Sequence, residues 1–191
     1  MRVELARSAG FCYGVRRAVE LAEQAAKSGR PCAMLGPIIH NGSVIDYLKE
    51  QGVALIQSPD QVPPGTAVII RSHGEGRAVH QALEARGCPV IDATCPNVSR
   101  IHRIVEEAEG EGRQVLIIGM PDHPEVAAIA GWCAHPVVLE GEQALARWLE
   151  ADPKRRELPI TMVSQTTSTH FIWTECVKKA KKECTNLKIF D

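Results

Sequence analysis

The sequence lacks any apolar run long enough to cross a membrane, since no stretch approaches the roughly 18 consecutive apolar residues that a spanning helix needs. Its first residues carry charges where a signal peptide would need an apolar segment. The net charge is −1 with 24% charged residues, so no excess of one sign indicates a nucleic-acid partner or a disordered tail. These absences predict a cytoplasmic chain that binds neither membrane nor nucleic acid.

The seven cysteines contain no Cys-x-x-Cys pair, which argues against a zinc ribbon or a thioredoxin-type motif. They are odd in number and irregular in spacing, so a secreted disulfide scaffold is not expected. Widely separated cysteines that a fold brings together fit an iron–sulfur cluster with few protein ligands. Five cysteines lack a distinctive context and are predicted to be structural: Cys32, Cys88, Cys133, Cys176 and Cys184.

Short apolar runs alternate along the chain with segments of helical periodicity. The runs lie at residues 32–35, 67–70, 89–91, 115–118, 137–139 and 160–163, and a weak first strand is expected at 3–6. Strands that alternate with helices form parallel sheets covered on both faces. The pattern therefore predicts an α/β fold built from small parallel sheets flanked by helices.

Two pairs of residues recur at one spacing. Cys12 and Cys95 are 83 residues apart, and so are His40 and His123, so each histidine follows its cysteine by 28. The strand context of the two pairs also matches. We therefore expect a pseudo-repeat in which two copies of one α/β unit each place a thiol and an imidazole at strand ends.

The repeat predicts a first unit at 1–95 and a second at 96–191. Residues 90–92 then match residues 189–191, and in the earlier copy Cys95 lies three residues beyond the aspartate. The corresponding third cysteine would lie beyond Asp191. We therefore expect this chain to hold two units of a three-unit protein, without the third.

Cys12 and Cys95 stand apart from the other cysteines by their surroundings. Cys12 lies between glycines, and Cys95 follows a short apolar run and precedes Pro96, which suits the first turn of a helix. The carboxyl ends of strands are where open α/β sheets place ligand sites. Metal ligation is therefore the favoured interpretation, and two small buried residues are the alternative.

Three histidines, His40, His73 and His123, each follow an apolar run at its exit. Imidazoles that converge there, helped by helix N-termini, would suit a polyanion such as a diphosphate. Surface histidines without a ligand are the alternative interpretation.

Glu125 lies two residues after His123 and could donate a proton in the same cavity. It could equally be an acidic residue that the helix dipole favours in a first turn. Thr166 follows the run at 160–163 among short polar neighbours, and a simple turn is its alternative interpretation. His73 and Thr166, 93 residues apart, make a looser third pair in the repeat.

Taken together, the motifs resemble the LytB/IspH family of 4-hydroxy-3-methylbut-2-enyl diphosphate reductases over the whole of the chain. Six segments in the right order carry the resemblance: Gly10 to Val15, His40-Asn41, Ser72-His73-Gly74, Asp92 to Pro96, Gly119 with His123 to Val126, and Gln165-Thr166-Thr167.

The resemblance implies a trefoil-like arrangement of three α/β units around a [4Fe–4S] cluster held by three cysteines. It also implies an iron–sulfur oxidoreductase that catalyses the last step of the non-mevalonate isoprenoid pathway. Such an enzyme removes the allylic hydroxyl of its substrate to give isopentenyl and dimethylallyl diphosphates, with electrons from a donor such as ferredoxin or flavodoxin.

The resemblance also assigns roles to seven residues. It implies that Cys12 and Cys95 ligate the cluster, Glu125 supplies a proton, and four residues contact the substrate: His40, His73, His123 and Thr166. Because the third cysteine would lie beyond Asp191, we expect this chain alone to hold no intact cluster and to be inactive.

Two other functions stay open on the sequence. A non-catalytic α/β module could bind a diphosphate ligand through the histidines alone. A zinc hydrolase would need three protein ligands close together, which only the histidines could supply.

Overall fold

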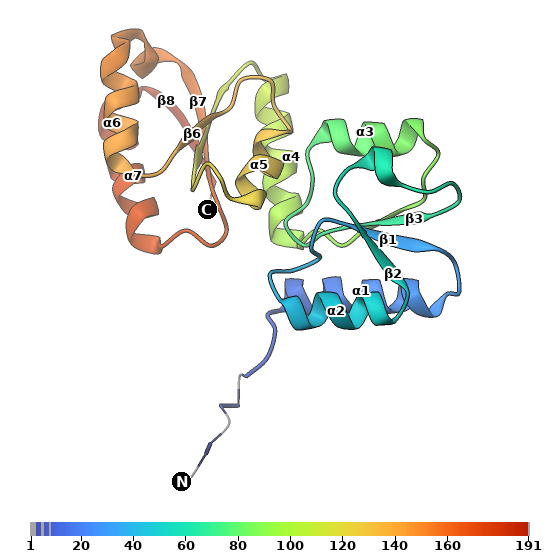
Figure 1. Cartoon of the computed structure of the whole chain (residues 1–191). Helices are drawn as coiled ribbons and strands as arrows, with labels where there is room; N and C mark the ends of the chain where they lie inside the picture. The colour runs from blue at the N-terminus through green and yellow to red at the C-terminus, as the bar shows by residue number, and fades with distance from the viewer. Residues whose placement is uncertain (1–2, 5, 8, 191) are drawn as a thin grey trace. The chain divides into compact units, whose positions relative to one another are not determined.

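A computed structural model describes residues 3–4, 6–7 and 9–190. The chain divides into two compact units. The first comprises Met1–Ser72 and Leu83–Cys95, and the second comprises His73–Ala82 and Pro96–Asp191. Each unit contains one four-stranded parallel sheet (Figure 1). The predicted α/β class and the repeated small sheets are confirmed.

The sheet of the first unit has the strand order β2-β1-β3-β4. Its strands are β1 (Cys32–Leu35), β2 (Val53–Ile56), β3 (Ala67–Ile70) and β4 (Val90–Asp92), and its helices are α1 (Tyr13–Lys27), α2 (Gly42–Glu50) and a 3₁₀ turn (Pro59–Gln61). Helix α3 (Arg77–Ala85) begins in the second unit and ends in the first. Apolar faces of α1 and α2 pack on the sheet, where Ala18, Ala22 and Leu48 are fully buried (Figure 1).

The sheet of the second unit has the equivalent order β6-β5-β7-β8. Its strands are β5 (Gln114–Ile118), β6 (Val137–Leu139), β7 (Pro159–Ser164) and β8 (Asn186–Ile189), and its helices are α4 (Pro96–Gly110), α5 (Pro124–Ala130), α6 (Glu142–Ala151), a 3₁₀ turn (Pro153–Glu157) and α7 (His170–Glu183).

Alternate residues of β5 face opposite sides of this second sheet, as the period of two in a strand requires. Ile117 packs with the α4 and α5 side, and Leu116 and Ile118 pack with the α6 and α7 side. The two pairs of helices lie on opposite sides of the strands (Figure 1). The unbroken apolar run of β5 from Val115 to Ile118 is therefore explained by a strand that is covered on both faces.

The repeat is visible in equivalent backbone hydrogen bonds. The amide of Gly36 donates to the carbonyl of Ile56 at 2.8 Å, and 83 residues later the amide of Gly119 donates to the carbonyl of Leu139 at 3.0 Å. Helices α1 and α4 both have 15 residues, and their first and last residues are also 83 apart. The spacing of the cysteines and histidines thus extends to the surrounding elements.

The pairing of residues between neighbouring strands shows that the two sheets are equivalent as far as their last strands, β4 and β8. Two rows of paired residues show it: Ala33, Val68 and Val90 in the first sheet, and Leu116, Met162 and Ile189 in the second. Val90 and Ile189 are therefore equivalent, as the sequence predicted, whereas Asp191 lies outside the described residues. In these rows Val68 of β3 corresponds to Met162 of β7, a spacing of 94 residues. Thr166 therefore corresponds to Ser72, and the predicted pairing of Thr166 with His73 is wrong by one position.

The weak first strand expected at residues 3–6 is not found. Val3, Glu4 and Ala6 are irregular, Leu5 lies outside the described residues, and the side chain of Val3 is 82% exposed. A strand needs a hydrogen-bonded partner, and none of the described strands pairs with this segment. Among the described residues, no helix is both long and apolar enough to cross a membrane.

Candidate functional site

Each of the two candidate cysteine ligands directly precedes a 15-residue helix. Cys12 is the N-cap residue of α1, and Cys95 precedes Pro96, the first residue of α4. Both thiols are free; Cys12 is exposed and Cys95 is half-buried. The Cys12 side chain therefore lies at a helix N-terminus and is open to a ligand.

The Cys95 side chain packs against the first turn of α1. A Cβ atom built on Gly14 would lie 2.5 Å from the Cys95 Sγ and 3.1 Å from its Cβ. Only glycine leaves room for this approach. The fold of the first unit therefore brings the Cys95 thiol to within two residues of Cys12, at one edge of the sheet.

The turn that carries Cys95 is held by hydrogen bonds from three directions. The guanidinium of Arg17 donates to the carbonyl of Thr94 at 3.0 Å and to that of Asp92 at 3.3 Å. The Asp92 carboxylate accepts from the Thr94 amide at 2.9 Å and from its hydroxyl. The amide of Cys95 donates to the carbonyl of Ser72 at 2.9 Å. These bonds fix the backbone that presents the thiol.

His40 lies in the first unit, between β1 and α2, and its side chain is exposed. The next residue, Asn41, caps α2 by accepting a hydrogen bond from the amide of Val44 at 3.2 Å. His40 therefore lies directly before a helix N-terminus.

His73 and His123 lie together in the second unit. Their ring centroids are 5.6 Å apart and the rings are nearly perpendicular, at 86°. His123 is the N-cap residue of α5, and its Nδ1 accepts a hydrogen bond from the amide of Glu125 at 3.1 Å. An accepting Nδ1 carries no hydrogen, so the neutral ring carries its proton on Nε2.

Glu125 is a buried carboxylate whose two oxygens both contact Thr166. Its side chain lies in the first turn of α5 and the residue is 2% exposed. One oxygen accepts from the Thr166 amide at 2.6 Å, and the other accepts from the Thr166 hydroxyl at 2.8 Å. Glu125 thus lies in the first turn of a helix, where the helix dipole favours an acidic residue. It also belongs to a polar network that joins α5 to the end of β7.

Gln165 holds the loop beside this network. Its side-chain oxygen accepts from the Met120 amide at 3.1 Å, and its side-chain nitrogen donates to the Thr167 hydroxyl at 2.6 Å. A Cβ on Gly119 would lie 2.9 Å from the Cβ of Gln165, so glycine is needed at that position. Sequence reasoning did not find the structural roles of Gly119, Gly14 and Arg17, although Gly14 lies inside a quoted motif.

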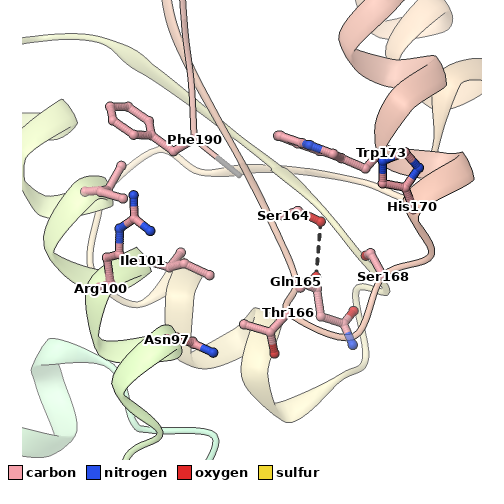
Figure 2. A pocket seen from close by; sticks show the side chains of 11 residues that line it. Asn97, Arg100, Ile101, Ser164, Gln165, Thr166, Ser168, His170, Trp173 and Phe190 are labelled. Carbon is pink, nitrogen blue, oxygen red and sulfur yellow. Dashed lines mark hydrogen bonds between the residues drawn. The ribbon is translucent and has the colours of Figure 1, made fainter.

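A cavity of about 380 Å³ opens in the second unit beside the loop that follows β7 (Figure 2). Asn97 and Arg100 reach it from α4, and Thr166 and Phe190 lie at the ends of β7 and β8. The remaining lining residues are Ile101, Ile104, Ser164, Gln165, Ser168, His170 and Trp173.

The cysteines predicted to be structural mostly have environments that disfavour ligation. Burial raises the pKa of the Cys133 thiol to about 11, with Glu109 adding to the effect, and raises that of Cys176 to about 11, with Glu142 adding to it. Burial also raises the pKa of Cys32 and of Cys184. A protonated thiol is a poor metal ligand, so these four are unlike the exposed Cys12.

A family model described as LytB protein matches residues 3–191. The chain belongs to the LytB family. The resemblance that the six motifs predicted is therefore confirmed.

Curated relatives in the LytB family are longer than this chain. A protein of Clostridioides difficile is 32% identical over 94% of this chain and 63% of its own length. One of Alkaliphilus oremlandii is 35% identical over all of this chain and 67% of its own length. Another, of Clostridium tetani, is 36% identical over all of this chain but 30% of its own length. All three are named 4-hydroxy-3-methylbut-2-enyl diphosphate reductase.

Two solved structures share the fold of the LytB chain. A structure of (E)-4-hydroxy-3-methyl-but-2-enyl diphosphate reductase, the terminal enzyme of the non-mevalonate pathway, is 34% identical with a TM-score of 0.82. It is matched over 98% of this chain and 66% of the other. The reductase of Plasmodium falciparum is 26% identical with a TM-score of 0.87, over 96% and 57% of the two chains.

Proposed function

We propose that this chain is the larger part of a reductase that acts on 4-hydroxy-3-methylbut-2-enyl diphosphate. The reaction consumes two electrons and two protons, releases the allylic hydroxyl as water, and gives isopentenyl or dimethylallyl diphosphate. Family membership supports this proposal, and the observation that carries it is the buried Glu125–Thr166 pair two residues from His123. A carboxyl group in that place can hold the proton that the leaving hydroxyl needs.

The two cysteines of the first unit fit a [4Fe–4S] cluster as two of its three ligands. The Cys95 side chain meets the first turn of α1, where Cys12 is the N-cap residue, and thiolates are the usual ligands of such clusters. The third thiol would come from a third α/β unit beyond Asp191, which would complete the trefoil-like arrangement. When bound, the cluster supplies electrons, received from a donor such as ferredoxin or flavodoxin, and a Lewis-acidic iron.

The histidines would bind the diphosphate of the substrate. The tautomer of His123 leaves its Nε2–H as a donor, and His73 lies beside it as a second imidazole. His40 would add a third donor, next to the N-terminus of α2. Thr166 would keep Glu125 oriented through its amide and hydroxyl while the carboxyl group transfers its proton.

Reconstitution of a longer chain that includes the third cysteine tests this proposal. Under anaerobic conditions with iron and sulfide, we expect about four irons per polypeptide and conversion of the allylic diphosphate. The Glu125→Gln variant should retain the iron and lose turnover. A longer chain that takes up no iron and sulfide would overturn the proposal. The present chain alone is expected to be inactive, and its cytoplasmic location remains a prediction.

A diphosphate-binding module without redox chemistry is the second candidate, favoured by the pairing of His73 and His123 inside one unit. It predicts that the present chain binds inorganic pyrophosphate without any metal. Calorimetry on the wild type, on His73→Ala and on the exposed control His135→Ala would separate binding at this pair from nonspecific binding. Pyrophosphate binding that survives His73→Ala would exclude it.

A further inference from the structure

We propose that a pocket in the first unit binds a small organic anion, whose short apolar chain lies against the sheet and whose charged head contacts Arg30. The pocket has a volume of about 340 Å³ and lies between the end of α1 and the amino ends of the strands. All of its lining residues belong to the first unit. The pocket is therefore separate from the histidine pair of the second unit.

The walls of the pocket are mostly apolar. Six residues form them: Leu21, Ala25, Cys32, Ala67, Pro89 and Ile91. Cys32 is 5% exposed, and burial raises the pKa of its thiol, so this wall stays uncharged at neutral pH. A chain of about five carbons that covers such walls removes apolar surface from water, which favours binding.

The polar part of the pocket consists of Gln24, Ser28 and Arg30. The Ser28 hydroxyl donates to the Ala25 carbonyl at 2.7 Å and accepts from the Arg30 amide at 3.3 Å, which holds the turn that carries the guanidinium. Gln24 and Arg30 are exposed, and within the described part of the chain their side chains take part in no hydrogen bond or ion pair. None of the described residues that line the pocket is acidic, so an anion would meet a cation and an amide without a like charge.

The repeat locates the equivalent space in the second unit. The spacing of 83 residues that relates α1 to α4 continues through the turns after them, where Gly29 and Gly112 have φ angles of 70° and 67°. It places Arg113 at the position of Arg30. Strand pairing relates β3 to β7 by 94 residues and β4 to β8 by 99, which gives the other equivalents: Thr161 for Ala67 and Lys188 for Pro89.

In the second unit, side chains of the protein fill this space. The Arg113 side chain is 8% exposed and donates from Nε to the Thr161 hydroxyl at 2.8 Å. The Lys188 ammonium lies 2.6 Å from the carboxylate of Glu111, which is the equivalent of Ser28. A buried guanidinium and an ion pair therefore close this end of the second sheet.

The first unit lacks the partners that would close its own sheet in the same way. Ala67 offers no hydroxyl to a guanidinium, and Ser28 and Pro89 cannot form an ion pair. Arg30 is accordingly exposed, whereas Arg113 is buried. The open space calls for a ligand that supplies apolar volume and a negative charge.

A ligand in this pocket would hold together the two elements that bring Cys95 to α1. The walls include Leu21 of α1 and Ile91 of β4. The first turn of the same helix places Gly14 against the Cys95 thiol, and Ile91 lies four residues before Cys95. Binding should therefore stabilise the contact between α1 and the Cys95 turn from its far side.

Calorimetry on the present chain tests the pocket with n-pentyl phosphate, inorganic phosphate and 1-pentanol as probes. We expect pentyl phosphate to have a dissociation constant at least about ten times lower than either of the others, because only pentyl phosphate contacts both the walls and the guanidinium. Arg30→Gln should weaken its binding about fivefold or more. Lys27→Gln is the matched control, since Lys27 is an exposed cation of α1 that does not line the pocket, and it should leave the affinity unchanged.

A variant that copies the second unit provides an independent test. Ser28→Glu combined with Pro89→Lys should form the ion pair seen between Glu111 and Lys188, close the pocket and abolish binding. Circular dichroism checks that the variant is folded. Amide hydrogen exchange locates the ligand in the wild type, where pentyl phosphate should slow exchange in residues 21–28 and 89–95.

Equal affinities for pentyl phosphate and inorganic phosphate would overturn the proposal, and so would an unchanged affinity in Arg30→Gln. Binding that survives in the folded Ser28→Glu and Pro89→Lys variant would place the ligand elsewhere. Slowed exchange around His73 and His123 in place of residues 89–95 would assign the anion to the histidines and overturn the pocket. None of these measurements involves iron or turnover, so they stand apart from the test of the proposed reductase.

Discussion

Gly14 is the residue on which the geometry around Cys95 depends most directly. The thiol lies where a side chain at position 14 would have to be, so the pair can exist only if residue 14 has no Cβ. Arg17 then adds the hydrogen bonds that hold the turn. The Cys95 thiol is thus positioned by the absence of a Cβ at Gly14 and by the guanidinium of Arg17, both on α1.

Replacement of Gly14 by alanine should displace the Cys95 thiol. We expect Gly14→Ala to destabilise the first unit by about 1–3 kcal/mol, as overpacking does, despite the gain in helix propensity. The reactivity of Cys95 toward a thiol reagent should rise in parallel. Gly42→Ala is the matched control, because nothing lies within 4 Å of a Cβ at that helical position; an equal loss of stability in both variants would contradict the prediction.

Removal of the Thr166 hydroxyl should leave the Glu125 carboxylate short of a donor. We expect Thr166→Val to lower the free energy of unfolding by roughly 1–3 kcal/mol, because a buried carboxylate oxygen loses its partner. Thr166→Ser keeps a hydroxyl and should lose much less. Urea unfolding of the three proteins measures the difference, and a valine variant as stable as wild type would refute the pairing.

At the scale of elements, the segment before α3 is anchored to the second unit by its backbone. A Cβ on Gly131 would lie 2.7 Å from the Cα of Gly76. The backbone at Gly76 and the backbone at Gly131 can therefore touch because both residues are glycines. The indole of Trp132 donates to the carbonyl of Glu75 at 3.0 Å, and Arg77 donates to the carbonyl of Trp132 at 3.0 Å. This anchoring fixes the segment that begins with His73.

Trp132→Phe should loosen this segment. The ring stack on His102 is retained, but the hydrogen bond to the Glu75 carbonyl is lost, at a cost of about 1 kcal/mol. We expect faster amide hydrogen exchange in residues 74–82. Trp148→Phe is the control, since that ring packs against the Arg155 guanidinium instead. Unchanged hydrogen exchange in Trp132→Phe would show that the contact between Gly76 and Gly131 is enough to hold the segment in place.

The Cys176 thiol of α7 should make the second unit sensitive to alkaline pH. Burial raises its pKa to about 11, above the value of about 8.5 in an unfolded chain. The folded state therefore keeps the proton longer, so its stabilising contribution is complete below about pH 8.5 and is lost as the pH rises toward 11.

Cys176 is expected to lower the free energy of unfolding by up to about 3 kcal/mol over this pH range. Urea unfolding at pH 8 and at pH 10.5 measures the difference. The variant Cys176→Ala should remove the Cys176 share of the pH dependence and leave the share of Cys133, whose pKa burial also raises to about 11, whereas the exposed Cys12→Ser should retain both. A pH dependence that is the same in Cys176→Ala as in the wild type would assign the effect to other groups.

The strands, the helices and the repeat could be predicted from the sequence, because buried strands such as β3 and β5 contain short runs of apolar residues. The motif cysteines and histidines could be found because they follow such runs. Arg17 could not be found, since its acceptors are backbone carbonyls 75 and 77 residues away and leave no mark in the sequence. The weak first strand failed because its apolar residues have no partner among the described strands.

At the scale of the whole molecule, the division of the chain is not simply sequential. Residues 73–82 precede the last strand of the first unit, β4, in the sequence, yet they group with the second unit. The hydrogen bonds of Arg77 and Trp132 account for this grouping.

Fragments that begin at different residues should reveal this division. A fragment of residues 73–191 keeps the anchoring segment, and a fragment of residues 96–191 lacks it. We expect the longer fragment to melt at least several degrees higher in circular dichroism, because the shorter one exposes Trp132 and leaves Glu109 without Arg77. Equal melting temperatures would show that the segment contributes nothing to the second unit.

The placement of each cysteine turn has a consequence for synthesis on the ribosome. The first unit opens with α1 and closes when the turn at Cys95 returns to that helix, so all its parts have been made once residue 95 has emerged. Residues 73–82 have been made by then as well, but they group with the second unit, where they contact Gly131 and Trp132, which are synthesised later. A nascent chain can therefore complete its first unit while the segment before α3 still lacks the residues that it packs against.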